Sequence, residues 1–189
     1  LKAAKVDLFS IIVNRADPEL RESIEKNVKL GEHKFPVYVL PEIADLGKPT
    51  IAEVVAALKL DGSHLSQEDL GRDINEIKIA AMTVSNFLNQ FADGDFVIVP
   101  GDRADVVAAT LASALSPTFP APSGMLLTGG LNNLPGNNTA VGSLLESAPF
   151  PVLSTDRDTF KSARAVSRVH GSVINGQARK LASAFGGWD

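Results

Sequence analysis

The chain has 189 residues, of which 44% are apolar and 21% charged, so it has the composition of a globular protein and not of a disordered tail, a collagen or a coiled-coil rod. Its 22 acidic and 18 basic side chains give a net charge of −4, which argues against non-specific nucleic-acid binding, since that requires a basic face. Cysteine is absent, which excludes disulfides, thiolate metal sites and a cysteine nucleophile. No apolar run approaches the ~20 residues of a membrane span, and we expect a cytoplasmic protein without membrane contact.

The first third of the sequence predicts alternating strands and helices. Residues 7–13 and 35–40 are short apolar runs that predict strands. Asp17 and Pro18 have the order of an N-cap followed by a first helical residue, which predicts a helix between the two strands. Thr50 and Glu53 have the spacing of a capping box, which predicts a helix from residue 51. We therefore expect a βαβα segment up to residue 66, where a polar stretch marks a boundary.

The remainder predicts a longer α/β body over residues 67–189. Residues 77–91 are predicted as one amphipathic helix, because apolar side chains recur at three- and four-residue intervals. Three apolar runs then follow, at residues 96–99, 124–127 and 151–153, each ending in a turn. Residues 132–138 are predicted as an exposed loop, and a last helix is predicted near residues 178–185. The pattern predicts a layered α/β fold with a mostly parallel sheet flanked by helices.

The three turns after these runs form a candidate ligand site, because ligands of open α/β sheets bind beyond the carboxyl ends of the strands. An anion could contact the Arg103 guanidinium and the backbone N–H groups beside Thr128. A purely structural interpretation stays open, in which Asp102 caps a helix and Arg103 pairs with Asp105 or Asp156. The candidate residues are Gly101, Asp102, Arg103, Thr128, Gly129, Gly130, Thr155 and Asp156.

No other motif predicts chemistry. The sequence holds no phosphate-binding P-loop, no dinucleotide-binding glycine motif and no nucleophile elbow. His33, His64 and His170 lie far apart, so we expect surface histidines and not metal ligands. We therefore expect no catalytic residue, no metal and no cofactor in this chain.

The order of the motifs resembles the DRTGG module of long-form bacterial phosphate acetyltransferases. Residues 96–106 (FVIVPGDRADV), 125–130 (MLLTGG) and 150–160 (FPVLSTDRDTF) carry this resemblance. Residues 11–15 (IIVNR) and 37–42 (VYVLPE) are similar to the last strands of that family's N-terminal domain, a P-loop fold related to dethiobiotin synthetase. The resemblance implies that residues 1–66 are the C-terminal part of that domain and residues 67–189 the DRTGG domain.

The resemblance implies a parent enzyme that transfers acetyl between coenzyme A and phosphate, with its P-loop upstream of Leu1 and its acetyltransferase domain downstream of Asp189. We therefore expect this chain to be a non-catalytic regulatory and assembly region that senses an anionic metabolite such as pyruvate or NADH. Expected partners are the remaining domains of the enzyme and further copies of it. The alternative is a ligand-free oligomerisation module of the same enzyme.

Overall fold

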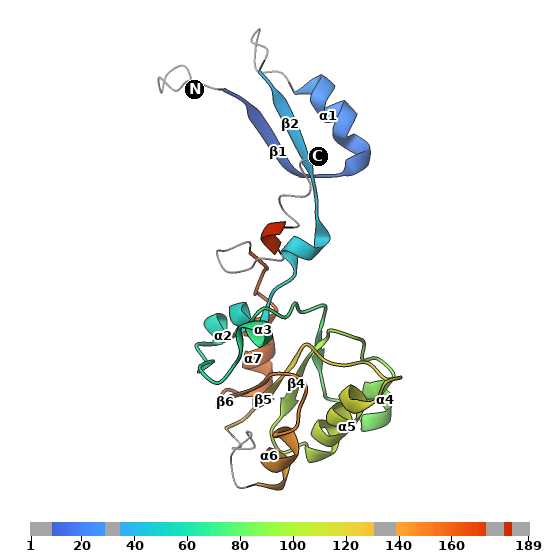
Figure 1. The fold of residues 1–189 in the computed structure, drawn as a ribbon, viewed down its shortest axis with the longest axis vertical. Helices are drawn as coiled ribbons and strands as arrows, with labels where there is room; N and C mark the ends of the chain where they lie inside the picture. The colour runs from blue at the N-terminus through green and yellow to red at the C-terminus, as the bar shows by residue number, and fades with distance from the viewer. Residues whose placement is uncertain (1–8, 29–34, 131–138, 173–179, 183–189) are drawn as a thin grey trace. The chain divides into compact units, whose positions relative to one another are not determined.

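The computed structural model describes residues 9–28, 35–130, 139–172 and 180–182, and it separates into two compact units (Figure 1). The first unit comprises residues 1–47 and 173–189, and the second comprises residues 48–172. The predicted boundary between residues 66 and 67 therefore falls inside the second unit. The predicted loop at 132–138 and most of the predicted helix at 178–185 lie outside the described residues.

The first unit contains a parallel two-stranded sheet with a helix in the connection. Strands β1 (Ile11–Ala16) and β2 (Val37–Pro41) pair in parallel, and the 3-10 helix η2 (Pro18–Leu20) and helix α1 (Arg21–Asn27) follow β1. Asp17 caps η2 as predicted, accepting a hydrogen bond from Glu19 N at 3.0 Å. A short 3-10 helix, η3 (Ala44–Gly47), follows β2.

The second unit is built on a four-stranded parallel sheet in the order β3-β4-β5-β6. Its described elements, in chain order, are α2 (Ile51–Leu58), α3 (Gln67–Leu70), β3 (Ile77–Ile79), α4 (Val84–Leu88), β4 (Phe96–Pro100), α5 (Ala104–Leu115), β5 (Gly124–Thr128), α6 (Ala140–Leu145), β6 (Val152–Thr155) and α7 (Thr159–Val166). The predicted α/β fold with parallel strands flanked by helices is confirmed.

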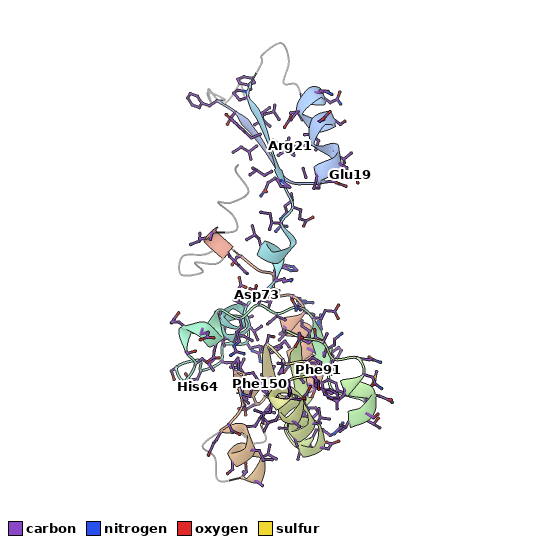
Figure 2. The ribbon with its side chains drawn as sticks, turned by 45° about the vertical axis from the view of Figure 1, so that its right-hand side comes forward. Glu19, Arg21, His64, Asp73, Phe91 and Phe150 are labelled. Atoms are coloured by element: carbon purple, nitrogen blue, oxygen red, sulfur yellow. The ribbon has the colours of Figure 1, made fainter. Side chains whose placement is uncertain are left out.

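Alternate side chains of the buried strands divide the core between the two faces of the sheet. Along β4, Val97 and Val99 belong to one apolar cluster, while Phe96 and Ile98 belong to the other. The first cluster packs against α4, α5 and α6 and includes Phe91 and Phe150, which Figure 2 marks. The second cluster packs against α2 and α7, which lie together on the opposite side (Figure 1). The second unit is thus a three-layer α/β/α body.

The single helix predicted over residues 77–91 is wrong. Residues 77–79 form strand β3, which pairs in parallel with β4 from Ile77 opposite Phe96 to Ile79 opposite Ile98. The helix is confined to α4, which begins after Thr83 and packs Phe87 into the core. The Ile-Lys-Ile alternation also satisfies a strand period, and pairing with the buried strand β4 decides between the two periods.

A tight turn before β4 ties together the loops that lead into three strands. Asn75 donates its N–H to Gly94 O at 2.9 Å and its side-chain amide to Asp93 O at 2.8 Å. Asp93 Oδ1 accepts from Ala121 N, and Asp95 O accepts from Ser123 N. Asp95 is 1% exposed, and this burial raises the pKa of its carboxyl although Ala92 N donates to it at 2.8 Å.

We expect Gly94→Ala to lower the free energy of unfolding by about 1–2 kcal/mol, because Gly94 has a φ of +75° that L-residues adopt at a cost of that size. A Cβ at this position would also lie 2.5 Å from Asn75 Nδ2. Urea denaturation measures the effect. The control is Gly47→Ala, whose Cβ would meet nothing within 4 Å. An equal effect of the two substitutions would contradict the explanation.

We expect Ser123→Ala to leave stability unchanged or to raise it by about 1 kcal/mol, because the Ser123 hydroxyl is buried without a hydrogen-bond partner among the described residues. Ser113→Ala is the matched comparison. The Ser113 hydroxyl is also buried but donates to Pro120 O at 2.7 Å, so its removal is expected to cost about 1 kcal/mol. Thermal unfolding of both variants tests this contrast, and a loss of stability in Ser123→Ala would refute it.

Candidate functional site

The strand register brings the three predicted turns to one edge of the sheet. Pro100 lies opposite Thr128, and Thr128 lies opposite Thr155, so β4, β5 and β6 end at the same level. The turn residues then bond across the strands, with Gly101 N donating to Thr128 O at 2.9 Å and Gly130 N donating to Thr155 O at 3.1 Å. The structure therefore gathers the residues of the three turns as the sequence predicts.

The backbone N–H groups of these turns are already donated within the protein. Besides Gly101 and Gly130, Gly129 donates its N–H to Arg157 O at 2.9 Å. Gly129 and Gly130 have φ angles of 92° and 66°, which favour glycine and allow both N–H groups to point at these carbonyls. In this conformation the N–H groups of Gly129 and Gly130 do not form an anion cradle, and the glycines serve to close the turn.

The hydroxyl of Thr128 is likewise engaged inside the protein. Thr128 is buried, and its Oγ1 lies 2.7 Å from Thr159 Oγ1 and 3.3 Å from Val99 O. Thr159 is the first residue of α7, so this contact joins the end of β5 to the start of that helix. Thr155 Oγ1 accepts from Arg157 N at 3.3 Å in the neighbouring turn. Both threonines therefore hold the turns in place.

Arg103 follows the structural interpretation that the sequence left open. Its Nε and Nη2 atoms contact the two carboxylate oxygens of Asp105 at 2.8 and 2.9 Å, and Nη2 also donates to Met82 O at 3.1 Å. The N-cap position of α5 is Arg103 and not Asp102, and the Arg103 side chain makes no capping hydrogen bond. The bidentate contact lowers the pKa of the Asp105 carboxyl to about 2 and raises the pKa of Arg103.

Arg157 is a cation of this edge that sequence reasoning did not select. It is exposed, and within the described part of the chain its guanidinium forms no ion pair. Its carbonyl accepts the N–H of Gly129, so it is fixed to the same turn as the predicted residues. The sequence did carry a signal. Residues 156–157, after β6, repeat the Asp-Arg pattern of residues 102–103, after β4. The predicted residues Asp102 and Asp156 are also exposed, and Asp156 directly precedes Arg157 in the sequence.

A separate cavity of about 210 Å³ lies in the first unit. None of the eight predicted residues lines it. Arg21, marked in Figure 2, is one of its lining residues and forms an ion pair with Glu25 at 3.1 Å. The lining residues are Ala16, Asp17, Pro18, Arg21, Val39 and Pro41, from the carboxyl ends of β1 and β2 and the start of the connecting helices.

Metal-binding and membrane-spanning features are both absent from the described part of the chain. The described residues hold no group of three or more histidine or acidic side chains arranged to bind a metal ion. None of the helices within the described ranges combines the length and the apolar character needed to cross a bilayer.

We expect Arg103→Gln to move the pKa of Asp105 from about 2 towards the ordinary aspartate value of about 3.9. Because the folded-state pKa is depressed, the stabilisation from this pair is present above about pH 4 and is lost as the pH falls towards 2. Titration of the Asp105 carboxyl carbon by NMR measures the shift. Arg164→Gln, an exposed cation on α7, serves as the control, and an unchanged Asp105 titration in Arg103→Gln would refute the assignment.

Comparison with known proteins places the chain in a family. A phosphate acetyltransferase of Nitratidesulfovibrio vulgaris is 36% identical over 192 residues, covering 95% of this chain and 26% of the relative. A phosphate acetyltransferase of Synechocystis sp. is 25% identical over 171 residues, covering 86% of this chain and 23% of the relative. The chain thus spans about a quarter of the length of these curated relatives.

The fold has a more distant likeness among solved structures. The regulatory region of Clostridium perfringens pyrophosphatase, comprising CBS and DRTGG domains and complexed with the activator diadenosine tetraphosphate, matches with a TM-score of 0.47 and 16% identity. The match covers 93% of this chain and 82% of that chain.

The family model described as the DRTGG domain matches residues 53–169, which include all three strand-end turns. The resemblance indicated by the sequence motifs is confirmed, and the chain belongs to the DRTGG domain family.

Proposed function

We propose that this chain is the DRTGG-containing regulatory region of a phosphate acetyltransferase and that it takes no part in acetyl transfer itself. The observation that carries the proposal is the alignment of 95% of the chain with about a quarter of a phosphate acetyltransferase, at 36% identity. The domain match at residues 53–169 supports the assignment of that quarter to a DRTGG region. Its proposed partners are the remaining domains of the enzyme.

The proposed regulatory ligand is a small anionic metabolite at the carboxyl ends of β5 and β6. Arg157 takes the role that the sequence analysis gave to Arg103, because Arg103 is paired with Asp105 and Arg157 is exposed without an ion pair among the described residues. An anion at Arg157 would act on a residue whose carbonyl holds Gly129 and whose neighbour Asp158 caps α7. Ligand binding would therefore be coupled to the position of α7.

The alternative function is a ligand-free oligomerisation module of the same enzyme. Two observations favour it. The N–H groups of the glycine turn are donated internally. Large apolar side chains are also exposed on the second unit, with Phe160 74%, Leu115 61% and Phe119 56% exposed. The assignment of residues 1–66 to a P-loop-like domain and the cytoplasmic location stay predictions.

Isothermal titration with pyruvate, NADH and ATP distinguishes the two functions. We expect at least one of these anions to bind the folded chain, and Arg157→Ala to weaken that binding tenfold or more, since a charge-assisted contact contributes about 1.5–3 kcal/mol. Arg164→Ala, which removes an exposed cation from the helix that follows Arg157, is the matched control and should bind as the unmodified chain does.

Absence of heat with all three anions would overturn the sensing proposal. Sedimentation velocity over a range of concentrations tests the alternative. A strictly monomeric chain at the highest concentration would overturn the oligomerisation module, whereas a dimer or larger assembly in the absence of ligand would support it.

A further inference from the structure

The chain enters the second unit at Lys48 and leaves it after Ser172. The carboxylate of Glu53 contacts both the entering segment, residues 48–51, and the outgoing segment, residues 170–172. Glu53 lies in the first turn of α2. Its Oε2 accepts hydrogen bonds from Thr50 N at 2.8 Å and Thr50 Oγ1 at 3.2 Å. Its Oε1 accepts from Ser172 N at 2.7 Å and Ser172 Oγ at 2.6 Å. Residues that lie 122 positions apart in the sequence, 50 and 172, are therefore held by the same side chain.

The entering segment has further attachments to the second unit. Ile51 N donates to Arg72 O at 3.1 Å, and Ile74 N donates to Pro49 O at 2.8 Å. Thr50 forms an antiparallel bridge with Asp73 and is buried. This segment would remain in place without Glu53.

The position of the outgoing segment, residues 170–172, depends on Glu53 much more than that of the entering segment does. Its last backbone hydrogen bond among the described residues runs from Val169 N to Val166 O, at the end of α7. Within those same residues His170 and Gly171 donate no N–H to the fold, and Ser172 is exposed. Among the described residues, Glu53 therefore supplies the hydrogen bonds that hold the outgoing segment after Val169.

We propose that Glu53 is a latch that holds the outgoing segment, residues 170–172, against the N-terminus of α2. Each carboxylate oxygen bonds to a different segment: Oε2 accepts from the entering segment, and Oε1 accepts from the outgoing segment. Hydrogen bonds to an ionised acceptor are about twice as strong as neutral ones, so the charge of Glu53 sets the strength of the latch. Opening it releases residues 170–172 while the sheet and its two apolar clusters stay intact. The proposal does not depend on a ligand at Arg157.

Amide hydrogen exchange followed by NMR on the full chain tests the latch. We expect the Ser172 amide to be protected in the unmodified chain and to exchange at least tenfold faster in Glu53→Gln, which keeps the shape of the side chain but removes its charge. Amides of Ile98 and Leu126, in the buried strands β4 and β5, should keep their rates and so report that the fold is intact. The matched control is Glu68→Gln. Glu68 is an exposed glutamate of α3, and its side chain forms no hydrogen bond within the described residues.

Ser172→Pro tests the coupling from the other side, because it removes both the N–H and the hydroxyl donor and leaves the Thr50 contacts in place. We expect the Thr50 amide to exchange severalfold faster in this variant, since the carboxylate loses the partner that orients it. An unprotected Ser172 amide in the unmodified chain, or an unchanged rate in Glu53→Gln, would overturn the latch. An unchanged Thr50 rate in Ser172→Pro would overturn the coupling of the two segments.

Discussion

The hydrogen bonds that join the carboxyl ends of β4, β5 and β6 constrain everything built on that edge of the sheet. Each turn is closed on its neighbour, since Gly101 N bonds to the end of β5 and Gly130 N to the end of β6. The Thr128–Thr159 contact extends the same bracing to α7. Because the backbone donors are satisfied within the fold, recognition at this edge is left to side chains that project outward. In the function proposed above, the exposed Arg157, and not the glycine turn, would therefore contact the anion.

The two-faced sheet explains why the fold could be predicted from the sequence. Strands buried on both sides read as continuous apolar runs, and the runs at residues 96–99 and 124–127 are of this kind. Capping pairs were equally informative, because Asp17 with Pro18 and Thr50 with Glu53 lie where the helices begin. At these positions the local sequence preference and the burial pattern favour the same secondary structure, so the sequence alone predicts it.

Where the local sequence pattern and the long-range pairing favour different secondary structures, the sequence alone does not decide between them. Residues 77–79 fit a helical period, but they form a strand because β4 offers a pairing edge that lies 19 residues further along the chain, Ile77 opposite Phe96. The candidate site shows the same limit. The order of the motifs placed the turns correctly, but whether Arg103 faces a ligand or Asp105 depends on the side-chain geometry of the folded turn. Arg157 was passed over because its exposure and lack of an ion pair are properties of the fold.

The meeting of residues 50 and 172 on one carboxylate has a consequence for how such a domain can be combined with others. A body whose two chain ends lie together can be inserted into a host polypeptide at a single point without separating the flanking segments of the host. The same closeness allows the ends to be bridged by a short peptide and new termini to be opened elsewhere. Residues 48–172 thus have the arrangement of chain ends that domain insertion and circular permutation require.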